Sequence, residues 1–150
     1  GGNPGNIPLV GHSAGGHLAA LLLASAWPLL SRRLPAVLVR KALAISGVYD
    51  LTPIRRTPFL QRDLHLTGQQ VMRLSPALLP APREAHLHCV VGGNESEEFK
   101  RQCGLMRQAW GSHYALRADV LPGMHHYSIV ESLADPGGEV HQMAVNLLRL

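Results

Sequence analysis

The sequence has no apolar run long enough to cross a membrane. Its longest, residues 18–30, has 13 residues and is interrupted by Ser25 and Pro28, whereas a membrane-spanning helix needs roughly 20. Two cysteines in 150 residues are too few for a disulfide framework, which favours reduced thiols and a cytoplasmic protein. The chain lacks an initiator Met and any charged residue before Arg32. We therefore expect no signal peptide and a start within a longer gene.

Aromatic residues are also scarce, at 5% of the chain. The net charge of +4 is unevenly spread, because residues 32–83 hold nine Lys and Arg against two acids and residues 84–150 hold five against eight. A basic stretch can bind phosphate, but no helix-turn-helix, RNA-binding or zinc-finger pattern accompanies this one. We expect a solvated surface and no nucleic-acid partner.

The chain is rich in short apolar segments bounded by turn-forming residues. With 46% apolar and 16% charged residues, residues 1–150 suffice for a single compact domain. The segments predict strands at residues 7–11, 41–46, 85–91 and 116–121, and helices from 14 or 15 to 27, at 67–74, 96–110 and 139–150. The polar, Arg-rich residues 53–66 contain two prolines and predict a surface excursion rather than a strand.

Alternation of strands and helices predicts an α/β fold, with a mainly parallel sheet covered by helices on both faces. Ligands of such sheets bind at the carboxyl ends of the strands. We therefore expect chemistry directly after Gly11, Gly47, Gly92 and Leu121.

A serine between glycines is the strongest local pattern. Residues 11–15 read G-H-S-A-G, which matches G-x-S-x-G where a predicted strand turns into a predicted helix. Such a turn strains the serine backbone and leaves no room for side chains at Gly11 and Gly15. We predict that Ser13 is a nucleophile above the sheet and that the backbone N–H of Ala14 stabilises an oxyanion. A strand-to-helix turn without catalysis is the alternative.

A serine hydroxyl needs a base to take its proton. His125 and His126 follow the last predicted strand, where the chain order Ser, acid, His would place that base. Pairs such as His86 and His88, or His12 and His17, have no third ligand at a suitable spacing. We therefore expect no metal and no cofactor. The remaining histidines are predicted to be structural or exposed: His12, His17, His65, His86, His88, His113 and His141.

The acid that orients the base is expected after the third strand. There residues 92–98 read GGNESEE, and Glu95, three residues past Gly92, is the first choice. Glu97 and Glu98 fit the first turn of a helix, where carboxylates interact favourably with the helix dipole. Asp50, after the second strand, fits a loop-ordering acid. These three remain alternatives.

Five segments together resemble the α/β-hydrolase superfamily, most closely its kynurenine formamidase (arylformamidase) branch. The stretch E-x-x-E-F-x-x-Q from Glu95 to Gln102 and the H-Y-S beginning at His126 favour that branch. The resemblance implies Ser13 as nucleophile, Glu95 as acid and His126 as base. The segments read GHSAGGHLAALLL (11–23), SGVYDL (46–51), LSP (74–76), VVGGNESEEFKRQC (90–103) and PGMHHYSIV (122–130).

The chain departs from this family pattern in two ways. Many members have Asp at the position of Glu95, and the HGG-type loop that completes their oxyanion hole, with the strands beside it, is not in this sequence. The resemblance implies a C-terminal portion of the α/β-hydrolase fold, a partial single domain over residues 1–150. Loss of one oxyanion donor, worth about 3 kcal/mol, predicts severe impairment, and the unpaired apolar edge of residues 7–11 predicts poor solubility.

The expected reaction is acyl transfer from a small molecule, and the resemblance implies N-formyl-L-kynurenine, cleaved to formate and kynurenine in tryptophan breakdown. A general short-chain carboxylesterase and a non-catalytic interaction domain are the alternatives. Arg55, Arg56 and Arg62 are expected to be solvated rather than to bind a substrate carboxylate. The sequence leaves a homodimer open.

Overall fold

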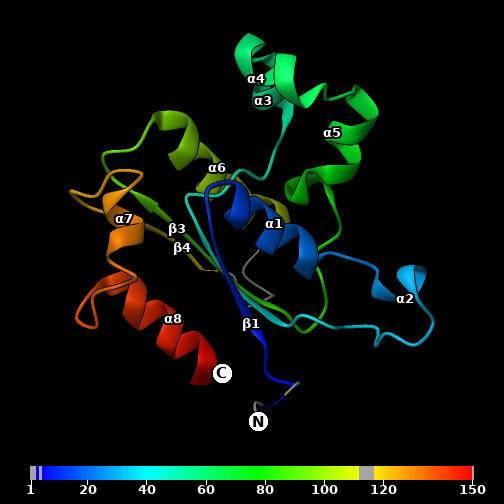
Figure 1. Ribbon diagram of the computed structural model, residues 1–150, viewed down its shortest axis with the longest axis horizontal. Coiled ribbons are helices and arrows are strands. Elements are labelled where there is room, and N and C mark those ends of the chain that lie inside the picture. Colours follow the sequence, from blue (N-terminus) through cyan, green and yellow to red (C-terminus); the bar gives the residue numbers. More distant parts are fainter. Residues whose placement is uncertain (1–2, 4, 112–116, 150) are drawn as a thin grey trace.

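Four parallel strands form the centre of the computed structural model, which describes residues 3, 5–111 and 117–149 (Figure 1). In these residues the strands lie side by side in chain order and every pair is parallel. Their bounds lie within a residue or two of the predicted ones, although position 116 lies outside the described residues. The predicted parallel sheet is confirmed. The strands are β1 (Pro8–His12), β2 (Lys41–Ile45), β3 (His86–Gly92) and β4 (Arg117–Leu121).

Helices cover both faces of this sheet. One face packs against α1 (Ala14–Leu23) and α6 (Glu97–Trp110), and the other against α7 (Ser128–Glu131) and α8 (Glu139–Arg149). Successive side chains of a strand point to opposite faces. Accordingly, Ala42 and Ala44 of β2 join the first cluster, and Leu43 and Ile45 join the second. The α/β fold class is therefore confirmed, with an apolar core on each side of the sheet.

The first helix is shorter and less buried than predicted. It ends at Leu23, and the hydroxyl of Ser25 donates to the carbonyl of Leu21, a local bond that competes with continuation of a helix. Pro28 does not stop this helix but lies in the first turn of a separate one, α2 (Trp27–Leu30), where its missing N–H costs nothing. Only one side of α1 contacts the sheet, and Leu18 on the other is 51% exposed.

Residues 53–66 are not part of the sheet, as predicted, but they are helical. They form α3 (Thr52–Arg56) and α4 (Pro58–Leu64), which have no buried residue and project from the domain (Figure 1). The helix α5 (Gly68–Leu74) begins at the predicted capping box between Thr67 and Gln70. Neither the short η1 (Pro76–Leu78) nor α7 was predicted. No helix within the described ranges has the length and hydropathy needed to span a membrane.

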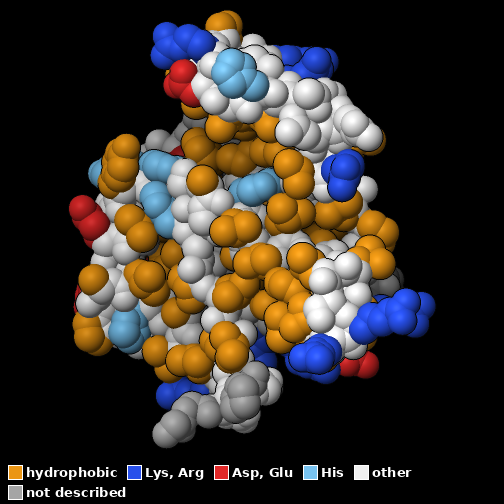
Figure 2. All heavy atoms as spheres, turned by 45° about the vertical axis from the view of Figure 1, so that its right-hand side comes forward, with side chains coloured by type: hydrophobic (Ala, Val, Ile, Leu, Met, Phe, Trp, Pro, Cys, Tyr) orange, Lys and Arg blue, Asp and Glu red, His pale blue; other side chains and the backbone are white. Residues whose placement is uncertain are grey.

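One apolar surface lies around β1. In the described sheet β1 pairs on a single side, with β2, and Ile7 and Val10 are about half exposed. Leu29 and Leu30 of α2 are also exposed, and Figure 2 shows apolar side chains spread over much of one face. The poor solubility predicted from this edge stays a prediction.

Candidate active site

Four side chains follow the ends of the four strands, at one edge of the sheet. Ser13 comes directly after β1, Ser46 after β2, Glu95 three residues after β3, and His126 five residues after β4. Because the strands are parallel, their carboxyl ends share this edge. The site is thus built from strands that are neighbours both in the chain and in the sheet.

Ser13 lies in a sharp turn between β1 and α1. Its backbone has φ 56° and ψ −116°, values that a residue with a side chain seldom adopts, and its N–H donates to the carbonyl of Ile45 at 2.9 Å. A methyl group on Gly11 would overlap the carbonyl of Gly15, so glycine is required there as predicted. This strained backbone is the one expected of the serine in a G-x-S-x-G turn between a strand and a helix.

The prediction that Gly15 is crowded is wrong. A Cβ on Gly15 would meet nothing within 4 Å in the described structure, whereas a Cβ on Gly16 would lie 3.0 Å from both the Cα of Gly47 and the carbonyl oxygen of Ile45. The close approach of α1 to β2 occurs one residue later than the pattern suggested.

The helix α1 begins at Ala14. The backbone N–H of this residue therefore has no partner within the helix and is a free donor beside the serine. The hydroxyl of Ser13 has no hydrogen-bond partner among the residues that the structure describes. Both groups are available to an external ligand.

Glu95 and His126 form a close pair. The Nδ1–H of His126 donates to Oε2 of Glu95 at 2.7 Å, and the Glu95 side chain is only 1% exposed, against 26% for His126. Glu95 Oε1 accepts from the N–H of Gly92 at 2.9 Å and from the hydroxyl of Ser46 at 2.5 Å. Because Nδ1 carries the proton, Nε2 of His126 is left as the basic nitrogen.

None of the alternative acids contacts His126. Glu97 is 90% exposed and pairs with a lysine on its own helix. Glu98 accepts from Arg101, and this hydrogen bond is the main reason that the pKa of Glu98 is lowered. Asp50 accepts from the backbone N–H of Thr52 at 2.8 Å, which is the loop-ordering role expected for it.

The two adjacent histidines have different roles. The ring of His125 accepts from the backbone N–H groups of Tyr127 and Ser128 at the start of α7. The ring of His126 instead packs between His12, at 4.5 Å between centroids, and Phe99, at 4.8 Å. A shallow pocket of about 390 Å³ lies over this ring and is also lined by Phe99 and Tyr127.

His12 ties the serine turn to the histidine loop. Its Nε2–H donates to the carbonyl of His126 at 2.8 Å. Burial lowers the pKa of His12, although the bond to His126 opposes that shift. His12 therefore holds the loop after β4 against the turn after β1, which is the turn that contains Ser13.

Ser46 is a site residue that the sequence reasoning missed, although it directly precedes Gly47, where chemistry was expected. Gln102, noted only as part of a motif, also has a clear role. Its Oε1 accepts from the backbone N–H groups of Tyr49 and Asp50, so it fixes the loop after β2 to α6. Because ligands bind at the carboxyl ends of parallel strands, the loop after β2 could be predicted to belong to the site. No sequence pattern, however, singled out Ser46.

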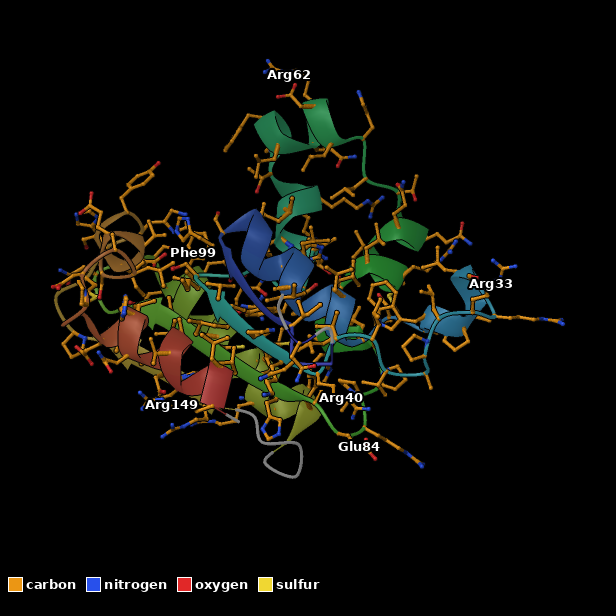
Figure 3. The ribbon with its side chains drawn as sticks, turned by 60° about the horizontal axis from the view of Figure 1, so that its bottom comes forward. Arg33, Arg40, Arg62, Glu84, Phe99 and Arg149 are labelled. Carbon is orange, nitrogen blue, oxygen red and sulfur yellow. The ribbon has the colours of Figure 1, made fainter. Side chains whose placement is uncertain are left out.

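The remaining candidates lie outside the site. His17 donates to the carbonyl of Val48, His88 pairs with Asp119 at 2.6 Å, and His113 lies outside the described residues. No group of three His, Cys, Asp or Glu suited to a metal occurs in residues 3, 5–111 and 117–149. Figure 3 shows Arg62 at the tip of the projecting helices, away from Phe99, where it pairs with its neighbour Asp63.

No protein-family profile matches the sequence. Kynurenine formamidase from Salmo salar is 31% identical over 147 residues, covering 93% of this chain and 49% of that protein. Kynurenine formamidase from Danio rerio is 31% identical over 133 residues, covering 85% of this chain and 44% of that protein. The chain therefore spans about half the length of the curated relatives it matches.

Solved structures show the same fold. A proposed thioesterase from Silicibacter sp. TM1040 is 30% identical with a TM-score of 0.78, covering 97% of this chain and 51% of that one. A carboxylesterase from Lactobacillus plantarum is 19% identical with a TM-score of 0.68, covering 98% of this chain and 59% of that one. The second likeness supports the fold alone.

Proposed function

Since the chain belongs to the α/β-hydrolase superfamily, we propose that it is a serine hydrolase in which Ser13, Glu95 and His126 form the catalytic triad. The single observation that carries this proposal is the hydrogen bond between buried Glu95 and His126 beside the strained Ser13 turn. An acid paired with a base, at the same edge of the sheet as a strained serine, supports the roles of a serine nucleophile and its activating pair.

In the proposed reaction, Ser13 Oγ attacks the acyl carbonyl of a small substrate while His126 Nε2 takes the hydroxyl proton. Glu95 keeps the imidazole oriented and stabilises its protonated form. The N–H of Ala14 donates to the developing oxyanion. His126 then protonates the leaving group, and a water activated by the same nitrogen releases the acid and restores the serine.

We propose an N-formyl aryl amide, N-formyl-L-kynurenine, as the substrate, because the relatives from Salmo salar and Danio rerio are named kynurenine formamidase. The products are formate and kynurenine. A general short-chain carboxylesterase is the second candidate, because a serine nucleophile with its acid and base can cleave an ester as well as an amide. Both candidates use the same three residues and differ in the acyl group and the leaving group of the substrate.

The deciding experiment compares kcat/KM for N-formyl-L-kynurenine and p-nitrophenyl acetate, using protein expressed from its complete gene. Ser13→Ala is expected to lose at least about 10³-fold in kcat on either substrate. The matched control is Ser31→Ala, since Ser31 is exposed and follows α2 rather than a strand.

Preference for the formyl amide, lost in Ser13→Ala, supports the formamidase. Turnover of the ester alone supports the carboxylesterase. If wild-type protein turns over neither substrate and a fluorophosphonate does not label Ser13, the hydrolase proposal is refuted in favour of a non-catalytic domain.

A further inference from the structure

Ser46 has a backbone conformation that favours glycine. Its φ is 49°, in the left-handed region that costs free energy for any residue with a Cβ. The residue is also 1% exposed, so water does not solvate its hydroxyl. A buried serine in a conformation better suited to glycine suggests that its hydroxyl makes a compensating interaction.

That interaction is with the acid of the proposed triad. The Ser46 hydroxyl donates to Oε1 of Glu95 at 2.5 Å, next to the N–H of Gly92 at 2.9 Å, while Oε2 receives the Nδ1–H of His126. The carboxylate is almost inaccessible to water. Protein donors must therefore stabilise it, and Ser46 is the side-chain donor on the oxygen that does not contact the histidine.

The main chain of Ser46 is held independently of this bond. Its N–H donates to the carbonyl of Val90 in β3 at 2.7 Å. Removal of the hydroxyl therefore leaves the anchor between β2 and β3 in place. Glycine at this position keeps the anchor, relieves the strained backbone and removes only the donor.

We propose that Ser46 is a positioning residue that holds the Glu95 carboxylate in the orientation from which it orients His126. This inference rests on the proposed triad. Without the hydroxyl, Oε1 keeps one donor, and the carboxylate can rotate about its terminal bond, where side-chain torsions are broad. The imidazole is then less well oriented when it takes the proton from Ser13.

The expected effect is a loss of kcat with little change in KM. A hydrogen bond to a charged group is worth enough to give roughly a tenfold change in rate. Ser46 lies behind Glu95 and outside the pocket over His126, so substrate binding should not depend on it. Ser46→Gly and Ser46→Ala should show the same loss, whereas only Ser46→Gly relieves the backbone.

A double-mutant cycle tests whether Ser46 acts through Glu95. The four proteins are wild type, Ser46→Gly, Glu95→Gln and the double variant, assayed by kcat and by the rate of fluorophosphonate labelling. Ser46→Gly should cost about tenfold in wild type and less than twofold beside Glu95→Gln, because the carboxylate it positions is then absent. Ser75→Ala is the matched control, since Ser75 is equally buried but accepts from Leu51 instead.

A purely structural role would give a different result. If Ser46→Gly is as active as wild type, or if its loss is equally large beside Glu95→Gln, the proposal is overturned. Labelling by fluorophosphonate does not depend on the substrate, so a wrong substrate assignment leaves this test intact. Failure of Ser13→Ala to abolish activity would instead refute the proposed function.

A spectroscopic measurement keeps the inference testable even if the protein is inactive. The proton between His126 and Glu95 should give a downfield N–H resonance, assigned by its loss in His126→Gln. In Ser46→Gly this resonance should broaden or shift because the carboxylate is no longer fixed. A resonance identical to that of wild type would overturn the positioning role whatever the enzymatic result.

Discussion

Two neighbouring glycines of α1 provide a sharp test of how closely this helix approaches the sheet. Gly15→Ala and Gly16→Ala make the same chemical change one residue apart in the same helix. A Cβ on Gly15 meets no atom within 4 Å, whereas a Cβ on Gly16 lies 3.0 Å from the backbone of both Gly47 and Ile45. Backbone atoms on two sides cannot move aside as a flexible side chain would.

The magnitudes follow from these distances. Replacing a helical glycine by alanine stabilises a protein by about 0.5–1 kcal/mol when space is available, so Gly15→Ala should be stabilising. Gly16→Ala has the same gain but also incurs the cost of overpacking, typically about 1–3 kcal/mol. The difference between the two variants therefore isolates the packing cost.

Urea denaturation of both variants, followed by circular dichroism, measures this difference directly. Each kcal/mol should also move the melting temperature by about 2–4 °C for a domain of this size. If Gly16→Ala is as stable as Gly15→Ala, the close packing of α1 on β2 is not present in solution, and the reasoning is refuted.

Three further outcomes are expected. Glu95→Gln should lower kcat by about 10³-fold or more because it removes the partner of the proposed base, whereas Glu97→Gln, at a 90% exposed side chain, should stay within about twofold in the same assay. Burial lowers the pKa of His17, so below about pH 6.5 the unfolded chain binds more protons than the folded one and the free energy of unfolding decreases with falling pH. Urea midpoints at pH 7.5 and 5.5 should show a smaller decrease in His17→Asn than in wild type, with exposed His65→Asn as the control; an equal decrease in all three proteins would contradict this reasoning. Burial raises the pKa of Cys103 to about 12, so a thiol reagent at pH 8 should react with it only after unfolding, and rapid reaction of the native protein would count against a buried thiol.

The fold could be predicted from the sequence because its strands are strongly marked. The first three are short, mainly apolar segments ending near a glycine, as expected for parallel strands that are buried on both faces. The fourth contains Arg117 and Asp119 and ends before Pro122 and Gly123. Ser13 could be predicted for a similar reason, since the turn from strand to helix imposes glycine at Gly11. These signals are local, and the structure agrees with them to within a residue or two.

Features that depend on distant contacts could not be predicted. Ser46 has its role only because Glu95, 49 residues later, returns to it across the neighbouring strand. Whether Gly15 or Gly16 is the crowded glycine depends on where β2 lies beneath α1. The sequence places the end of α1 at Pro28, which is the stronger local signal, whereas the helix ends at Leu23, where the hydroxyl of Ser25 donates to the carbonyl of Leu21.

The order of the strands also makes this fold suitable for division into two cooperating pieces. Ser13 lies between β1 and α1, whereas Ser46, Glu95 and His126 all follow the largely exposed connection of residues 31–38. A break there would place the proposed nucleophile on one fragment and its acid and base on the other. Each fragment could be fused to one of two proteins that associate with each other. The proposed hydrolysis would then return only when β1 pairs again with β2, so that substrate turnover would report the association of the two proteins.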